Sequence, residues 1–189
     1  MDLQKLNVKF FVEPPDTVPL TEFIDVFHGW IQATDGDYHD VADYSHMQDG
    51  PGIVLIANEA NVSIDETGNR RGLLFSQKSR LSGSNQEKLR SVFRSALESC
   101  RKLEKEPALR GKLRFKPTEA VISVNDRLLG SNSEESFEEI KDDIDEFAKR
   151  LFGSADVSLE RNSDPCQRLN VRLKTAAAVD LGKALEALG

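Results

Sequence analysis

Residues 62–76 read Val-Ser-Ile-Asp-Glu-Thr-Gly-Asn-Arg-Arg-Gly-Leu-Leu-Phe-Ser, and they indicate the fold class. The two ends of this segment, Val62 to Asp65 and Gly72 to Ser76, are rich in the apolar and β-branched residues of short strands. Between them stands Glu66-Thr67-Gly68-Asn69, whose glycine and asparagine favour a turn. Because a hairpin pairs its strands antiparallel, we expect an antiparallel sheet rather than a doubly wound parallel one.

Other segments repeat this pattern of short apolar runs around turn residues. Residues 113–124 predict a hairpin that turns at 116–119, and residues 157–173 predict another that turns at 162–165. Further strands are expected at residues 6–12 and 53–57, whereas residues 38–46 are ambiguous. Most of the sheet should therefore be built from hairpins.

Three segments repeat apolar residues at helical spacing, which predicts amphipathic helices at about residues 19–31, 85–106 and 133–152. Packing these helices on a largely antiparallel sheet is the simplest way to bury their apolar faces, so we expect an α+β fold. Residues 1–175 should form a single domain. The alanine- and leucine-rich tail, residues 176–189, should be either helical or frayed.

The composition is that of an acidic globular protein. The 189 residues include 25 Lys and Arg against 32 Asp and Glu, which gives a formal net charge of −7. This balance argues against generic nucleic-acid binding, which needs a basic face. No apolar run approaches the ~20 residues that span a bilayer, and we see no secretory signal. The two cysteines give no zinc framework. We therefore expect a cytoplasmic protein without a membrane segment.

The charges are unevenly distributed along the chain. Residues 10–69 contain twelve acidic side chains and no Lys or Arg, whereas residues 84–130 have a net charge of +5. These segments either complement each other within the fold or leave an acidic surface for a cation or a basic partner. The second expected helix is basic, and eight of residues 134–146 in the third are acidic. Their charges could match within one chain or across a homodimer interface.

A short cluster of histidines and aspartates forms a candidate metal site. His39, Asp40, Asp43 and His46 supply imidazole nitrogens and carboxylate oxygens, which are the ligands of catalytic zinc, manganese or iron sites. Their spacing matches no established ligand motif. The same residues could instead cap turns and pair with basic helix residues, and the sequence leaves both interpretations open.

A second candidate is the triplet Asn125-Asp126-Arg127, which ends an expected strand. Arg127 could orient a ligand carboxylate or phosphate, or the three side chains could pair internally. Signals for nucleophilic or nucleotide chemistry are weak, since no Gly-x-Ser-x-Gly elbow and no Walker or dinucleotide glycine pattern occurs. Cys100 lies on an apolar helical stripe and should be buried, whereas Cys166 follows a turn and should be exposed.

Five short motifs of the chain are informative when taken together. They are Phe27-His28-Gly29-Trp30-Ile31, Asp40-Val41-Ala42-Asp43-Tyr44-Ser45-His46, Asp49-Gly50-Pro51-Gly52, Asn58-Glu59-Ala60-Asn61 and Asn125-Asp126-Arg127. Together they resemble a family of small bacterial proteins that has no assigned function. The resemblance covers roughly residues 6–175. It implies a single compact unit and supplies no catalytic residue.

Two functional hypotheses follow from these observations. The leading one is a non-catalytic binding or assembly module, which could act as a homodimer, because the charge is segregated and catalytic motifs are lacking. The alternative is a metal-dependent, hydrolase-like enzyme that uses residues 39–46. In that case a divalent metal ion would activate a bound water molecule.

Overall fold

The computed structural model describes residues 1–126, 130–164 and 166–189. Along this part of the chain the elements are β1 (Leu6–Val12), α1 (Leu20–Ala33), β2 (Tyr38–Tyr44), β3 (Gly52–Ala57), β4 (Ala60–Asp65), the short 3-10 helix η1 (Thr67–Asn69), β5 (Gly72–Gln77), α2 (Asn85–Lys105), β6 (Phe115–Val124), α3 (Glu134–Phe152), β7 (Val157–Arg161), β8 (Asn170–Thr175) and α4 (Leu181–Ala187). No helix among these residues is long and apolar enough to cross a membrane.

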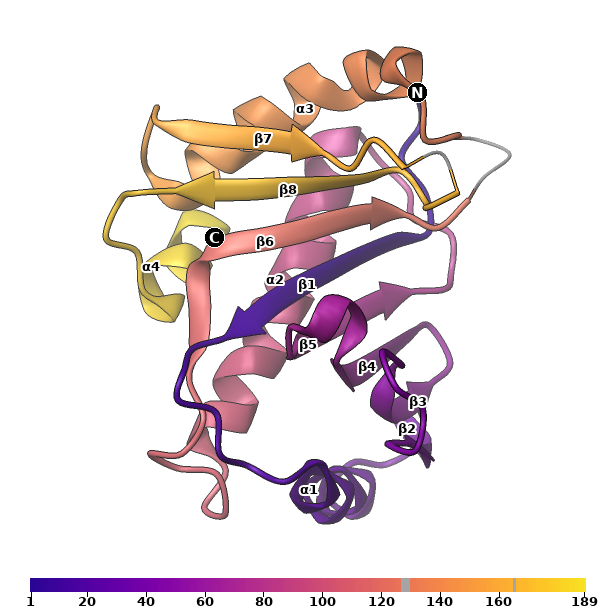
Figure 1. Ribbon diagram of the computed structural model, residues 1–189, viewed down its shortest axis with the longest axis vertical. Coiled ribbons are helices and arrows are strands. Elements are labelled where there is room, and N and C mark those ends of the chain that lie inside the picture. Colours follow the sequence, from indigo (N-terminus) through magenta and orange to yellow (C-terminus); the bar gives the residue numbers. More distant parts are fainter. Residues whose placement is uncertain (127–129, 165) are drawn as a thin grey trace.

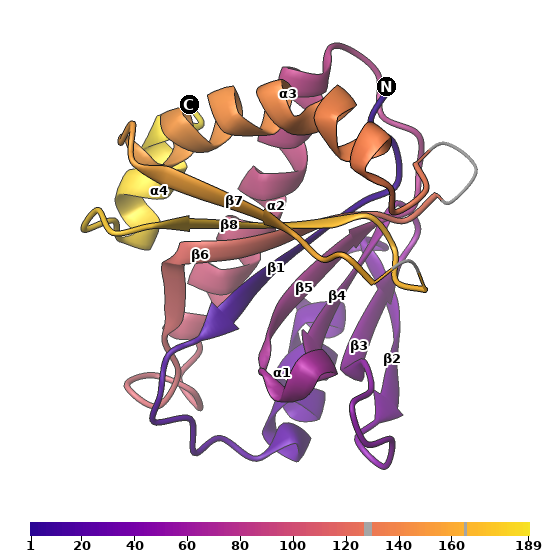
Figure 2. The ribbon, with the colours of Figure 1, turned by 45° about the horizontal axis from the view of Figure 1, so that its top comes forward.

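The strands form one antiparallel sheet in the order β2-β3-β4-β5-β1-β6-β8-β7 (Figure 1). The α+β class with an antiparallel sheet is therefore confirmed. The hairpin of residues 62–76 pairs as predicted, with Val62 opposite Phe75. The sheet is strongly twisted, so that the strands at its two ends run in clearly different directions (Figure 2).

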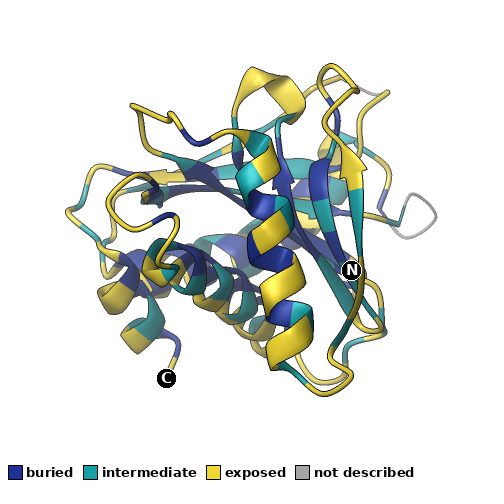
Figure 3. Ribbon diagram, turned by 90° about the horizontal axis from the view of Figure 1, so that it is seen from below, coloured by how far each residue is buried: buried dark blue, intermediate teal, exposed yellow. Residues whose placement is uncertain are grey.

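One face of the sheet is apolar and carries the helices. Residues on this face form a continuous row from strand to strand: Leu55, Val62, Phe75, Val8, Ile122 and Val171. All are nearly buried and belong to one core with the apolar stripes of the helices. The helices expose residues on their outer sides, while the strands behind them are largely buried (Figure 3). Because side chains alternate along a strand, the intervening residues face the other, open side.

The three predicted helices are present, and a fourth joins them. α4 lies in the tail after residue 175, and its residues Leu181 and Ala184 are buried in the common core. α2 and α3 pack against each other, with the rings of Phe93 and Phe147 4.8 Å apart between their centroids. The basic and the acidic helix therefore meet within one chain, and a homodimer stays a prediction.

The predicted hairpin of residues 113–124 is wrong. Residues 115–124 form a single strand, β6, that pairs with β1 on one side and β8 on the other. Against β1 the register jumps, because Phe10 lies opposite Ala120 while Phe11 lies opposite Lys116. The residues from Pro117 to Glu119 thus have no partner on β1. Proline fits there because it has no N–H to donate to a ladder.

Candidate functional site

The edge strand β2 carries most of the predicted metal cluster. His39, Asp40, Asp43 and His46 are all exposed. Asp40 and Asp43 lie three residues apart in a regular part of the strand, so their side chains leave opposite faces of the sheet. His39 is the extra residue at the point where the register with β3 shifts, between Tyr38 and Asp40. The strand therefore spreads these side chains apart.

The two aspartates of this cluster bind nearby backbone groups. The carboxylate of Asp40 accepts a hydrogen bond from the N–H of Val41 at 2.8 Å, and that of Asp43 accepts one from Ser45 at 2.8 Å. Hydrogen bonds from Ser45 lower the pKa of Asp43, and the charge of His46 adds to this effect. Among the described residues, no three His, Cys, Asp or Glu side chains converge to hold a metal ion. The metal site stays a prediction, which elemental analysis of tag-free protein would test.

The second predicted site lies just beyond the end of β6. The carboxylate of Asp126 is 3.3 Å from the ammonium of Lys5, and the backbone N–H of Asn125 donates to the Lys5 carbonyl at 3.0 Å. Asp126 is thus paired within the chain. Arg127, the residue predicted to contact a ligand, lies outside the described residues. A ligand-binding role for Asn125-Asp126-Arg127 stays a prediction.

The cysteines lie where the sequence predicted them. Cys100 is buried on α2, and burial raises its thiol pKa well above the ordinary value. A thiol of this kind stays protonated and unreactive. Cys166 is exposed in the segment between β7 and β8.

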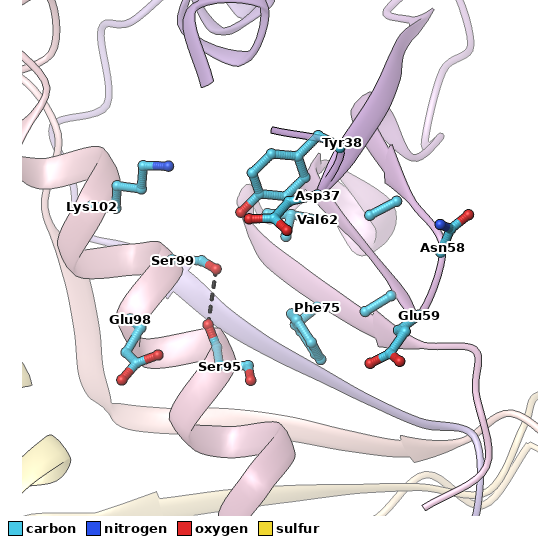
Figure 4. A pocket seen from close by; sticks show the side chains of 13 residues that line it. Asp37, Tyr38, Asn58, Glu59, Val62, Phe75, Ser95, Glu98, Ser99 and Lys102 are labelled. Carbon is cyan, nitrogen blue, oxygen red and sulfur yellow. Dashed lines mark hydrogen bonds between the residues drawn. The ribbon is translucent and has the colours of Figure 1, made fainter. Parts of the chain in front are cut away.

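A pocket of about 530 Å³ lies between α2 and the sheet, and we call it the helix-side pocket (Figure 4). Its floor is apolar, since it includes the nearly buried side chains of Val62 and Phe75 on β4 and β5. α2 contributes Ser95 and Ser99, which stand on the same side of the helix because they are four residues apart. The hydroxyl of Ser99 donates to the carbonyl of Ser95 at 2.8 Å, so its proton is already engaged in a hydrogen bond within the helix.

An ammonium group lies against two aromatic rings at one end of this pocket: Lys102 and Tyr38 belong to the lining, and Trp30 contacts both. The Nζ atom of Lys102 lies 3.8 Å from the ring centroid of Trp30 and 5.6 Å from that of Tyr38. Burial lowers the pKa of Lys102, and the charges of Glu106 and Asp37 counteract this only in part. Trp30 is held in place by its indole N–H, which donates to Glu106 at 2.6 Å. Lys102 is therefore fixed against aromatic faces.

Carboxylates dominate the charged groups that line the helix-side pocket. Asp37, Glu59 and Glu98 contribute three negative charges, although Glu98 also pairs with Arg94 at 3.1 Å, and Lys102 contributes the one positive charge among the described lining residues. Figure 4 shows Glu59 and Glu98 on opposite sides of the pocket, one from the β3–β4 turn and one from α2. All three carboxylates belong to exposed residues. An apolar floor below a negative mouth suits an organic cation with an apolar body.

Only part of the helix-side pocket could be predicted from the sequence. Asp37 and Glu59 lie in the acidic segment that suggested a surface for a cation. The polar row Ser95, Ser99 and Lys102 has helical spacing on α2 and could have been noticed as a second polar stripe. Nothing in the sequence, however, shows that this row faces the β3–β4 turn, because that contact depends on the tertiary fold.

The resemblance to a family of small bacterial proteins stays a prediction. Its motifs are spread over the fold: residues 27–31 lie in α1, residues 49–52 lead into β3, and residues 58–61 form the turn into β4 at the helix-side pocket. No family model matches the chain, and no curated protein matches it either.

Proposed function

We propose that this protein is a non-catalytic binding module whose helix-side pocket takes up an organic cation with an apolar body. One observation carries the proposal: the apolar floor of Val62 and Phe75 lies below a mouth with three carboxylates and one ammonium. The cation could be a free amine or the side chain of a basic partner. Both would present the same chemistry to the pocket.

The positions of the polar groups favour binding over covalent chemistry. Ser99 donates its hydroxyl to the helix backbone, and Lys102 faces the rings of Trp30 and Tyr38. Within the described part of the chain, neither group makes a hydrogen bond to a base that would activate it as a nucleophile. The pocket thus offers an apolar surface and negative charge.

The expected affinity is modest. Exposed charge pairs contribute about 0–1 kcal/mol each, and covering part of the floor adds about 25 cal/mol for each Å² of apolar area. We therefore expect a Kd of about 0.1–1 mM for a small aromatic amine. A partner protein that also contacts the rim would bind more tightly.

An NMR titration with two probes of opposite charge tests the proposal. Phenethylamine and phenylacetate share an aromatic ring, but the first is an ammonium and the second a carboxylate. We expect phenethylamine to shift the amide signals of residues 57–60 and 95–102, and phenylacetate to leave them unchanged. Equal binding of the two probes, or no shift with phenethylamine, would contradict the proposal.

A charge variant tests the role of the mouth. Replacing Glu59→Gln removes one carboxylate of the helix-side pocket and should weaken phenethylamine binding about threefold, which corresponds to less than ~1 kcal/mol. Glu13→Gln is the matched control, since Glu13 is also exposed and lies outside the pocket. Equal affinities of the two variants would show that Glu59 does not attract the ligand.

The sequence also suggested a homodimer and a cytoplasmic location, and both remain proposals. The edge strand β2 supports an assembly role, because its outer side is unpaired within the described chain. Light scattering at low and at high salt tests the homodimer. A dimer mass at either salt concentration would support it, and a monomer mass at both would refute it.

A further inference from the structure

On the open face of the sheet, the central strand β1 places polar side chains that are nevertheless buried. Asn7, Lys9 and Phe11 of β1 point to this side, away from the helices, because they alternate with the core residues of the same strand. Each is less than 10% exposed. Two adjoining hollows lie here, and described residues from strands and loops line them.

The smaller hollow, of about 400 Å³, is rich in arginine, and we call it the Arg70 hollow. Among the described residues, its charged lining consists of Arg70, Arg161 and Arg172 against the single carboxylate of Glu160. The guanidinium of Arg70 lies over the ring of Phe11, with its Cζ atom 3.6 Å from the ring centroid. These lining residues have a net charge of +2 in a chain whose net charge is −7, although Arg161 also pairs with Glu134 at 2.8 Å.

A buried carboxylate holds two of these arginines in place. Glu119 accepts hydrogen bonds from Arg70 at 2.7 Å, from the Nε atom of Arg172 at 2.7 Å and from Lys116 at 3.2 Å. Three cations therefore share one negative charge. The side chains of Arg70 and Arg172 remain 42% and 38% exposed. Their other guanidinium nitrogens can bind an anion, and arginine pairs suit phosphate in particular.

Asn7 lines the larger hollow, which has a volume of about 740 Å³, and we call it the Asn7 hollow. The Oδ1 atom of Asn7 is buried and has no hydrogen-bond partner among the described residues, while the residue itself is 5% exposed. A buried acceptor without a hydrogen-bond partner is unfavourable, and a ligand N–H could supply the missing partner. The charged residues of this hollow balance, since Lys9 and Arg168 stand against Asp49 and Asp65.

The strand register sets the distance between Arg172 in the Arg70 hollow and Asn7 in the Asn7 hollow. Arg172 lies in the same cross-strand row as Lys9, two strands away, and Asn7 lies two residues from Lys9. These steps correspond to about 10 Å across the strands and about 7 Å along them. A nucleoside monophosphate can bridge such a span between its phosphate and its base.

We propose that the two hollows form one site for a nucleotide-sized organic phosphate. Its phosphate would bind Arg70 and Arg172, and the edge of its base would bind the carboxamide of Asn7. Asparagine pairs best with an edge that offers both a donor and an acceptor, as adenine does with N6 and N7. This site lies on the sheet face opposite the helix-side pocket and does not depend on the proposed function.

Calorimetry with AMP and ribose 5-phosphate tests the proposal. AMP should bind more tightly than ribose 5-phosphate, because only AMP carries a base for Asn7. Replacing Arg172→Gln should weaken both ligands about tenfold, which is ~1.4 kcal/mol. Arg150→Gln is the matched control, because Arg150 is an exposed arginine on α3, and it should alter the affinity of neither ligand. Replacing Asn7→Leu should weaken AMP and leave ribose 5-phosphate unchanged.

Two results would overturn this inference. The first is no binding of AMP to the wild-type protein, and the second is AMP binding that Arg172→Gln leaves unchanged. If AMP does not bind but a single-stranded oligonucleotide does, the surface is a nucleic-acid surface instead. A circular dichroism melt of each variant confirms that it is folded before its affinity is compared.

Discussion

At the scale of single residues, the most unusual feature is a buried ion pair on the open sheet face. The ammonium of Lys9 lies 2.5 Å from a carboxylate oxygen of Asp65, and both side chains are less than 10% exposed. Burial lowers the pKa of Lys9 although Asp65 opposes this effect. Thr67 completes the cluster, since its carbonyl accepts from Lys9 and its hydroxyl donates to Asp65. Such a pair stabilises the fold only while both partners are present.

A double-mutant cycle tests this pair. Replacing Lys9→Met leaves the carboxylate of Asp65 buried without its cation, so we expect unfolding free energy to fall by about 3–4 kcal/mol. The double variant Lys9→Met/Asp65→Leu removes both charges and should recover most of that loss. Urea unfolding gives the three values. A single variant that loses less than ~1 kcal/mol would contradict this account.

At the scale of elements, the entry into β3 depends on one glycine. Gly52 has a φ of +64°, and a Cβ atom there would collide with the carbonyl oxygen of Ile64 on the neighbouring strand β4. Both the backbone conformation and the space therefore require glycine. This position lies in the segment Asp49-Gly50-Pro51-Gly52, whose glycines and proline favour a turn.

Replacing two different glycines with alanine separates the requirement for a positive φ from the requirement for space. Gly52→Ala should cost about 3 kcal/mol or more, because it adds a steric clash to the strain of a left-handed backbone. Gly111→Ala is the control, since Gly111 has a φ of +79° and open space around it. The control should cost only about 1 kcal/mol. Equal shifts in thermal unfolding of the two variants would contradict the packing described for β3 and β4.

The elements also show where sequence reasoning succeeds and fails. The β4–β5 hairpin was predictable because local residues determine it, and both Gly68 and Asn69 adopt the positive φ that its turn requires. β6 was not predictable, because Pro117 resembles a turn residue and only the register with β1 shows that it lies in a bulge. The helix-side pocket could be predicted only in part, for the same reason. Asp37 and Glu59 at its mouth belong to one acidic segment that is visible in the sequence. The contact between Lys102 and Tyr38 joins distant segments and depends on the tertiary fold.

At the scale of the whole molecule, Glu119 links distant parts of the chain. Its partners are Arg70 after the 3-10 helix, Lys116 on its own strand and Arg172 on β8. Burial alone would raise the pKa of Glu119, but hydrogen bonds from these three cations outweigh it and lower the pKa to about 2. The folded state thus favours the ionised form of Glu119.

This lowered pKa predicts how stability depends on pH. The unfolded chain protonates Glu119 near 4.5 and the folded chain near 2, so its contribution is complete above pH 4.5 and disappears as pH falls to about 2. The shift corresponds to about 3 kcal/mol. Urea unfolding across this pH range should therefore show a loss in the wild type that is much smaller in Glu119→Gln. Glu13→Gln, an exposed control, should keep the wild-type dependence, and an equally steep loss in Glu119→Gln would contradict the assignment.

The central claim is that the helix-side pocket binds an organic cation, and blocking the pocket tests it most directly. Ser95→Phe should fill the space between α2 and the floor formed by Val62 and Phe75, whereas Ser91→Phe places the same ring at an exposed position of α2 outside the pocket. The decisive measurement is the Kd of phenethylamine for these two folded variants. We predict that Ser95→Phe abolishes binding and that Ser91→Phe retains the wild-type Kd. Unchanged binding in Ser95→Phe would show that the cation binds elsewhere or not specifically.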